Sequence, residues 1–180
     1  MTLVEHETAA AYAALLRGEL DFAITFDYDR APQPAPVGLV RTRLFEDPVL
    51  VVLPASHRLA GRSTVELAEI PAGEWSGTPV TQIEHELLTE LPGATGPLHF
   101  RGDDFRTAVR LVAEGLGAAL LPALALASPA PGVVGIPLTG KPLTRRVYTC
   151  RLDSRRTHPA LTTFHECLRW AACDVTGAKS

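Results

Sequence analysis

One stretch of the sequence, Val49-Leu50-Val51-Val52-Leu53, restricts the possible folds more than any other. It is apolar throughout and rich in β-branched residues, which is typical of a strand covered on both faces. We therefore expect this strand at the centre of a sheet. A chain of 180 residues, 46% of them hydrophobic, is long enough to bury such a sheet in one domain or in two small lobes.

Helical and strand-like segments alternate along the rest of the chain. Apolar residues at helical spacing predict helices at residues 9–16, 80–91, 105–115 and 158–171. Runs of β-favouring residues predict strands at residues 20–26, 38–45, 98–100, 118–121, 133–136 and 147–150, and Leu3-Val4 as the end of another. Alternation of this kind indicates an α/β fold with a mainly parallel sheet.

Charge and cysteine content limit the partners and the compartment. The formal net charge of -3 provides no overall positive field for nucleic acid. Three cysteines are too few for a disulfide scaffold, which favours a reducing cytoplasm. The first residues lack a secretory pattern, and the longest apolar stretch, residues 115–127, is shorter than the roughly 20 residues of a membrane helix. We expect a soluble cytoplasmic protein without a membrane partner.

The two ends of the chain carry opposite charge. Residues 1–29 contain six acidic and one basic residue, a net of -5, whereas residues 141–169 contain seven basic and two acidic residues, a net of +5. One interpretation is ordinary solvated surface. The other is that both ends pack in the same lobe and attract each other.

Motifs for catalysis, metals and nucleotides are incomplete. Three His-Glu pairs lack the second histidine of a zinc protease, and His165, Cys167 and Cys173 lie on different helix faces. No Gly-x-Ser-x-Gly elbow is present. The segment 135–142 resembles a phosphate-binding loop, but Pro142 replaces the hydroxyl residue that would hold magnesium. We therefore predict no catalytic residue, metal or cofactor.

Polar residues precede several predicted helices. They are Thr8, the trio Ser76, Gly77 and Thr78, and the pair Asp103 and Asp104. Such residues either cap the helix or, with the free backbone amides, bind a small anion. Helix starts converge on one edge of a parallel sheet, so this edge is the candidate ligand cleft.

Four motifs, in order along nearly the whole chain, resemble a known family. They are Leu15-Leu16-Arg17-Gly18-Glu19-Leu20-Asp21-Phe22-Ala23-Ile24; the segment 44–60, which contains Pro48 and Ser56-His57-Arg58-Leu59-Ala60; the segment 109–122, which contains Glu114-Gly115-Leu116-Gly117; and Ile136-Pro137-Leu138 with His158-Pro159-Ala160-Leu161. Together they look like the effector-binding domain of LysR-type transcriptional regulators.

This resemblance implies two Rossmann-like α/β lobes, similar to a type 2 periplasmic binding protein, with a small-molecule effector in the cleft between them. Crossings near residues 47 and 133 place residues 1–47 and 134–180 in the first lobe and residues 48–133 in the second. The first lobe would lack the family's usual first strand and helix. The family's helix-turn-helix is not in this sequence, so DNA would be bound only through a domain outside it.

The resemblance and the helix starts together give the expected effector contacts. These are Thr8, Thr25, Phe26, Ser76, Gly77, Thr78, Asp103, Phe105 and Pro122. Thr8 is expected both to cap its helix and to line the cleft, and the effector to be an organic anion. The leading hypothesis is a sensor without catalysis, while the alternatives are a transporter's solute-binding protein and an enzyme on the same scaffold. An open strand edge in the first lobe also predicts a homodimer or higher oligomer.

Overall fold

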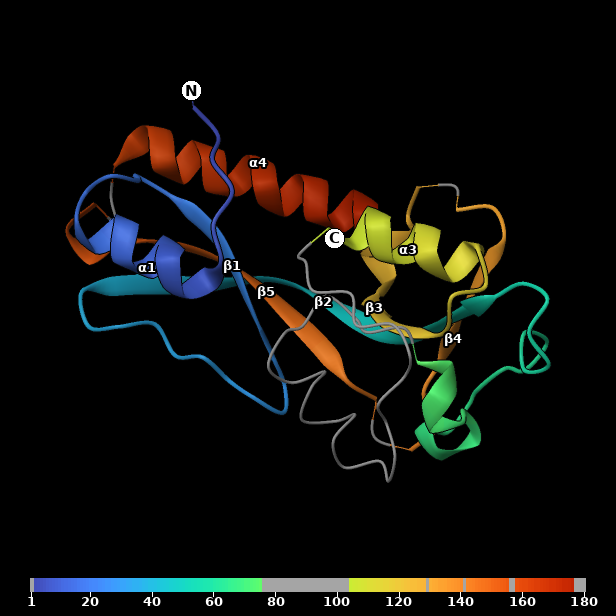
Figure 1. Ribbon diagram of the computed structural model, residues 1–180. Coiled ribbons are helices and arrows are strands. Elements are labelled where there is room, and N and C mark those ends of the chain that lie inside the picture. Colours follow the sequence, from blue (N-terminus) through green and yellow to red (C-terminus); the bar gives the residue numbers. More distant parts are fainter. Residues whose placement is uncertain (1, 76–103, 129, 141, 156–157, 177–180) are drawn as a thin grey trace. The chain divides into compact units, whose positions relative to one another are not determined.

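The structure is a computed structural model that describes residues 2–75, 104–128, 130–140, 142–155 and 158–176. The chain divides into two compact units. Unit 1 comprises Met1–Asp47 and Arg145–Ser180, and unit 2 comprises Pro48–Thr144. Both ends of the chain therefore belong to unit 1, and unit 2 is one continuous segment between its two parts (Figure 1).

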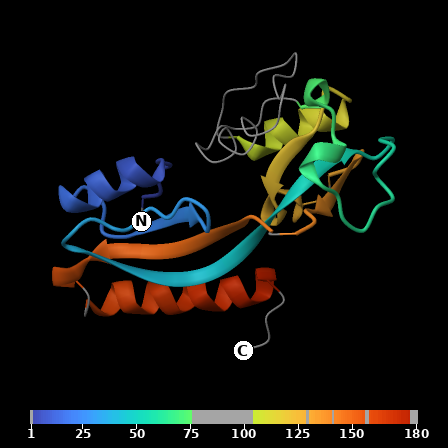
Figure 2. The same cartoon turned by 90° about the horizontal axis from the view of Figure 1, so that it is seen from below.

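Unit 1 is a sheet between two helices (Figure 2). Its strands run in the order β1 (Ala23–Tyr28), β5 (Thr144–Leu152) and β2 (Leu39–Pro54). β1 and β5 are antiparallel, with Ala23 opposite Cys150 and Tyr28 opposite Arg145. Helix α1 (Thr8–Leu16) covers one face of this sheet, and helix α4 (Pro159–Thr176) covers the other.

Alternation along the strands decides which side chains meet each helix, because successive residues of a strand point to opposite faces. On one face, Ala23 and Cys150 form a core with α1, to which the helix contributes Ala11, Tyr12 and Leu15. On the other face, Phe22 meets Phe164 of α4 edge to face, with ring centroids 5.1 Å apart. The Ala-rich sequence of α1 ends at Gly18, whose φ of 74° lies in the region that favours glycine.

In unit 2, the second part of β2 lies between β3 (Ala119–Pro122) and β4 (Val133–Pro137). Both pairings are antiparallel, and Val51 stands opposite Leu120 on one side and Ile136 on the other. Helix α3 (Phe105–Ala113) packs against this ladder. The shared core consists of Val52, Ala108, Val109, Val112, Ala119 and Leu121. The apolar run at residues 49–53 is thus the central strand of unit 2, as predicted.

Asp104 caps α3, because its carboxylate accepts a hydrogen bond from the Arg106 amide at 3.0 Å. Bonds from the Thr107 hydroxyl and the Arg106 amide lower the pKa of Asp104. Short 3-10 helices complete the described elements: η1 (Leu67–Glu69), η2 (Ala72–Glu74), η3 (Ala123–Leu126) and η4 (Asp153–Arg155). Within the described residues, no helix has the length and apolar character needed to cross a bilayer.

Two sequence predictions need correction, and two more lie outside the described residues. The sheet is not mainly parallel: each described strand pairing with a recorded register is antiparallel, and the parallel contacts are the isolated bridges Val65 to Leu138 and Trp75 to Ala118. Leu3 and Val4 are exposed and form no strand. The predicted helix at residues 80–91 and strand at residues 98–100 lie outside the described residues.

The strands predicted at residues 38–45 and 49–53 are one continuous strand, β2. Pro48 lies within this strand, although a proline cannot donate a ladder hydrogen bond. In the structure, Pro48 stands where β2 passes from unit 1 into unit 2. The end of unit 1 at residue 47 coincides with the expected lobe boundary, whereas β4 lies wholly within unit 2. The identity of the units with ligand-binding lobes stays a prediction.

Candidate functional site

The hydroxyl of Thr8 links the start of α1 to the edge of β1. Its Oγ1 donates a hydrogen bond to the Phe26 carbonyl at 3.1 Å and accepts one from the Phe26 amide at 3.2 Å. The predicted cap is wrong, because Thr8 is the first helical residue and Glu7 holds the cap position without a side-chain bond. Thr8 instead occupies the backbone groups that a neighbouring strand would use, and it is 5% exposed.

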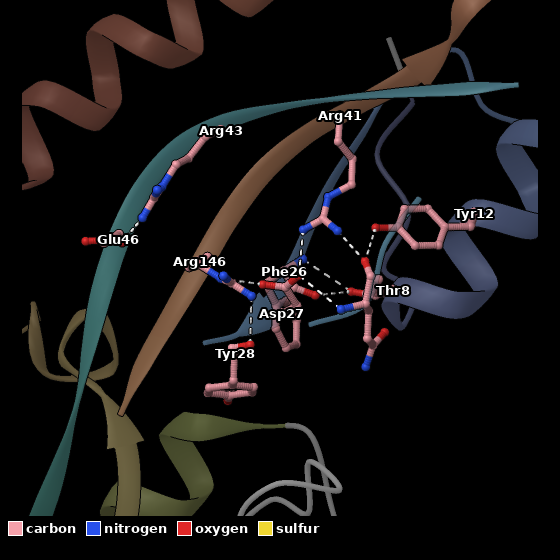
Figure 3. Close-up of polar contacts among 10 residues, drawn as sticks. Thr8, Tyr12, Phe26, Asp27, Tyr28, Arg41, Arg43, Glu46 and Arg146 are labelled. Atoms are coloured by element: carbon pink, nitrogen blue, oxygen red, sulfur yellow. Dashed lines mark hydrogen bonds and ion pairs between the residues drawn. The ribbon is translucent and has the colours of Figure 1, made fainter. Parts of the chain in front are cut away.

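Beside Thr8, the buried carboxylate of Asp27 lies between two arginines (Figure 3). Its Oδ2 is 2.9 Å from Nη2 of Arg41 on β2, and its Oδ1 is 2.9 Å from Nε of Arg146 on β5. The Gln33 amide also donates to Oδ2 at 3.1 Å. Three strands and a loop therefore converge on one carboxylate, which we call the Asp27 cluster: Asp27, Arg41 and Arg146.

Each arginine of the cluster has a further contact. The Arg146 Nη2 donates to the Tyr28 carbonyl at 3.0 Å. The Arg41 guanidinium lies 3.4 Å from the centroid of the Tyr148 ring and also donates to the Gln33 carbonyl. A planar guanidinium suits such combined stacking and hydrogen bonding, which a lysine would not reproduce.

A second buried ion pair lies where both strands pass between the units. Nη2 of Arg145 is 2.6 Å from Oδ2 of Asp47, and their side chains are 12% and 2% exposed. Asp47 is the last residue of the first part of unit 1, and Arg145 is the first residue of its second part. Because Arg145 and Arg146 are neighbours on β5, their side chains point to opposite faces of the sheet. Arg145 therefore pairs with Asp47, and Arg146 pairs with Asp27.

The charge balance of the Asp27 cluster indicates what it attracts. Two guanidinium groups share one carboxylate, which leaves a formal charge of +1 in a largely dehydrated setting. Both oxygens of the Asp27 carboxylate are engaged by arginines. The cluster can orient a negatively charged ligand, but it offers no nucleophile.

The structure brings together the predicted site residues of unit 1. Thr8, Thr25 and Phe26 lie at the junction of α1 and β1; Thr25 is 1% exposed, and Phe26 is half-buried. Phe105 and Pro122 belong to unit 2, where Phe105 starts α3 beside the apolar core and Pro122 ends β3. The predicted contacts Ser76, Gly77, Thr78 and Asp103 lie outside the described residues.

Sequence reasoning missed Asp27, Arg41 and Arg146. We assigned Asp27 to a loop, whereas β1 continues to Tyr28, and we began the last strand at Val147, whereas β5 begins at Thr144. A signal was present, since each of these charged residues adjoins an apolar strand segment. A buried strand admits a charge at low cost only when a partner neutralises it.

The cysteines have different surroundings. Cys150 is buried in the α1 core, and burial raises the pKa of its thiol to about 11. Cys167 is exposed and Cys173 is half-buried, both on α4. No group of three or more His, Cys, Asp or Glu side chains within the described part of the chain could hold a metal ion.

Comparison with known protein families identifies the chain. The family model of the LysR substrate binding domain matches residues 1–172. The chain belongs to this family. No match was found among curated protein sequences.

Solved structures of LysR regulatory domains show the same fold. The reduced OxyR regulatory domain from Pseudomonas aeruginosa has a TM-score of 0.77 at 21% identity, over 94% of this chain and 80% of that one. Another structure of reduced OxyR has a TM-score of 0.71 at 26% identity, over 97% and 81% of the two chains. The regulatory domain of MetR from N. meningitidis has a TM-score of 0.66 at 19% identity, over 88% and 75%.

The LysR substrate-binding domain is thus an α/β structure of the two-lobed, periplasmic-binding-protein type, and its structural relatives are regulatory domains of transcription factors. The chain spans 58% of full-length OxyR from Pseudomonas aeruginosa. The family resemblance that the sequence motifs suggested is confirmed. Four motifs carried that inference, and two of them are seen in the fold as the α1–β1 unit and the strand at residues 49–53.

Proposed function

We propose that this LysR substrate-binding domain senses a small organic anion and binds it between two lobes, formed by unit 1 and unit 2. Family membership supports a sensor over a transporter's solute-binding protein. The observation that carries the choice of an anion is the Asp27 cluster, in which Arg41 and Arg146 share one carboxylate. A ligand carboxylate beside this cluster would meet a net positive charge.

The contacts on unit 1 would be Thr8, Thr25 and Phe26, next to the cluster. Thr25 and Thr8 bring hydroxyl groups, and Phe26 brings a half-buried ring. The contacts proposed on unit 2 are Ser76, Gly77, Thr78, Asp103, Phe105 and Pro122. A ligand that touches both sets stabilises one arrangement of the lobes over others, and this differential binding is the physical basis of a sensor.

We also propose that the domain is not an enzyme. Its structural relatives are regulatory domains, and Asp27 is engaged by two arginines. DNA would be bound by a helix-turn-helix domain of a longer regulator in the cytoplasm. Homodimers or larger assemblies of such regulators would match the two-fold symmetry that is common in operators.

Isothermal titration calorimetry with mono- and dicarboxylates tests the proposal, because it measures the dissociation constant of each ligand. Arg146→Gln removes one positive charge from the cluster, and Arg146→Lys keeps the charge but not the planar fork. Loss of a hydrogen bond to a charged group costs about 1.5–3 kcal/mol, so we expect roughly tenfold to hundredfold weaker binding with glutamine. Arg43→Gln is the matched control, because Arg43 lies on β2 and is exposed in a pair with Glu46.

Two results would contradict the proposal. If neutral ligands bind and carboxylates do not, the choice of an anion is wrong. If a ligand is consumed during the titration and products accumulate, the domain is an enzyme. Binding without turnover, weakened by Arg146→Gln and unchanged by Arg43→Gln, supports a sensor that uses this cluster.

A further inference from the structure

Arg145 contacts both neighbouring strands of unit 1, because its strand β5 lies between β1 and β2. Toward β2, its Nη2 is 2.6 Å from Oδ2 of Asp47, and both side chains are largely buried. Toward β1, its guanidinium lies over the Phe26 ring, 5.4 Å from the ring centroid. A planar guanidinium can bind a carboxylate through its N–H groups and contact an aromatic ring at the same time. Arg145 therefore joins the Phe26 ring to the Asp47 carboxylate.

The Phe26 ring is held by a second residue, Tyr28. The two rings meet edge to face, with centroids 6.0 Å apart. Tyr28 stands opposite Arg145 in the register of β1 and β5, so all three side chains lie on the same face of the sheet. Tyr28 is buried, whereas Phe26 is half-buried. A ring that neighbours already hold in one orientation loses little conformational freedom when a ligand packs on it.

Asp47 lies where β2 leaves unit 1. The next residue, Pro48, has no backbone N–H to donate to a ladder. Beyond Pro48, the Val49 amide donates to the Leu143 carbonyl at 2.9 Å, and both residues are buried. The Asp47–Arg145 ion pair thus ties the two passing chain segments together on one side of Pro48. The Val49–Leu143 hydrogen bond ties them together on the other side.

The ion pair differs from an apolar contact in how it responds to a displacement. A buried ion pair gives little net stability over an apolar pair of similar size. When one partner moves away, however, an uncompensated buried charge remains, which is strongly unfavourable. A displacement of the Arg145 guanidinium is therefore opposed by the Asp47 carboxylate and passed on to β2.

We propose that Arg145 is a positioning residue of the effector-binding site, which orients the Phe26 ring and connects it through Asp47 to the two chain segments that pass between the units. The inference rests on the proposed function, in which Phe26 is an effector contact. A ligand packed on the Phe26 ring restrains the guanidinium that contacts this ring, and the ion pair then holds β2 and β5 together where they leave unit 1. Effector binding therefore stabilises the connection between the units.

Hydrogen exchange of single amides, measured by NMR with and without ligand, tests this connection. The probes are succinate and phenylacetate, an aliphatic and an aromatic carboxylate, each added to saturation as judged by calorimetry. The Val49 amide should exchange roughly tenfold more slowly in the bound protein. The Val65 amide is the internal control, because Val65 is buried in unit 2 and donates to the Pro137 carbonyl at 3.0 Å. Its exchange rate should change less than about twofold.

Two variants separate the ring from the ion pair. Phe26→Leu removes the ring and keeps the ion pair, whereas Asp47→Asn keeps the ring and removes the charge that holds Arg145. At ligand saturation, both variants should lose the selective slowing of the Val49 amide. Asp47→Glu keeps the charge and should restore the slowing. Glu46→Gln is the matched control, because Glu46 is the exposed neighbour of Asp47, and it should keep both the slowing and the ligand affinity.

Arg145→Lys tests the orientation of the ring. The lysine keeps a positive charge for Asp47 but not the flat guanidinium over Phe26. The dissociation constant of phenylacetate should rise roughly twofold to thirtyfold, which corresponds to the loss of one cation–π contact. An unchanged dissociation constant in a folded Arg145→Lys protein would rule out the positioning role.

The outcomes distinguish this inference from the proposed function. If no carboxylate binds the wild-type protein, the proposed function is wrong and the inference falls with it. If carboxylates bind but slow the Val49 amide no more than the Val65 amide, the effector site stands and the inference is wrong. That comparison uses the unaltered chain, so it holds even if the variants fail to fold. Selective slowing that persists in Asp47→Asn would also overturn the inference, because the connection would not pass through the ion pair.

Discussion

The two units stabilise their sheets in different ways. Among the described residues, the buried polar and charged side chains all belong to unit 1: Thr8, Thr25, Asp27, Asp47 and Thr149. The core of unit 2 around α3 is apolar. Burying an ion pair costs desolvation energy that the attraction between the charges only partly offsets. In an apolar core, by contrast, each buried apolar atom adds to the free energy of unfolding.

This difference predicts which substitutions each unit tolerates. In unit 2 the loss of stability should follow the volume removed or added, because packing is the main interaction there. In unit 1 it should follow whether a partner charge remains. Unit 1, which keeps charges in its interior, should therefore be more sensitive to isosteric changes of charge than to changes of volume.

The largest expected effect is that of Asp27→Asn. The change keeps the shape but leaves Arg41 and Arg146 without a negative partner, so we expect the free energy of unfolding to fall by about 3–5 kcal/mol. Urea denaturation followed by circular dichroism measures it. Glu19→Gln is the control, because the Arg17–Glu19 pair is exposed and should contribute little. A loss below about 1 kcal/mol for Asp27→Asn would remove the contrast between the units.

Leu121→Ala tests the apolar side of the comparison. Leu121 is fully buried in the unit 2 core, and the cavity left behind should lower the free energy of unfolding by about 2–5 kcal/mol. The fluorescence of buried Trp75, which belongs to unit 2, follows the transition. Leu116→Ala, at a half-exposed position, should cost far less. A similar loss at both positions would mean that packing does not dominate this unit.

Gly135→Ala adds volume instead of removing it. A Cβ at Gly135 of β4 would lie 2.5 Å from Cδ1 of Leu126 and 2.9 Å from Cδ1 of Leu50. Both leucines must shift, so we expect a loss of about 1–3 kcal/mol in a thermal or urea melt. At Gly61 a Cβ meets nothing within 4 Å, and Gly61→Ala should leave stability nearly unchanged. Equal melting of the two variants would show that β4 has room to adjust.

The smallest effect concerns pH and lies in unit 1. Burial, with Arg151 and Arg169 nearby, lowers the pKa of His165 below its usual 6.5, while Glu166 acts in the opposite direction. Below pH 6.5 the unfolded chain therefore takes up a proton that the folded chain does not. The stability present above pH 6.5 is lost as the pH falls toward the lowered pKa. The difference between the urea midpoints at pH 7.5 and pH 5.5 should be smaller in His165→Gln than in the wild-type protein. An equal difference in the two proteins would contradict the assignment of this pH dependence to His165.

The helices were predictable because their signals are local. The Ala-rich stretch after Thr8 and the apolar stripe of α3 with its Asp104 cap gave both helices almost to the residue. Pairing direction was not predictable from alternation, because β1 and β5 lie more than a hundred residues apart and meet in antiparallel register. Sequence order alone does not determine which strands become neighbours.

The candidate site was predictable only in part. Thr8, Thr25 and Phe26 follow from a helix start and a strand end, which are local features. The Asp27 cluster combines side chains from β1, β2 and β5. Each charge taken alone is consistent with an exposed residue or a loop. Their pairing becomes visible only when the register places Asp27 opposite Arg146.

The strand order β1-β5-β2 constrains the order in which the protein can be assembled during synthesis. β5, which lies between β1 and β2, is the last of the described strands to leave the ribosome. Until residues 144–152 emerge, β1 and β2 have no common neighbour, and the carboxylate of Asp27 cannot pair with Arg146. Unit 2 is continuous in sequence and can collapse earlier, so translation should produce a folded unit 2 while unit 1 is still open. A chain that stops before residue 144 would retain most of unit 2, while unit 1 would lack its middle strand.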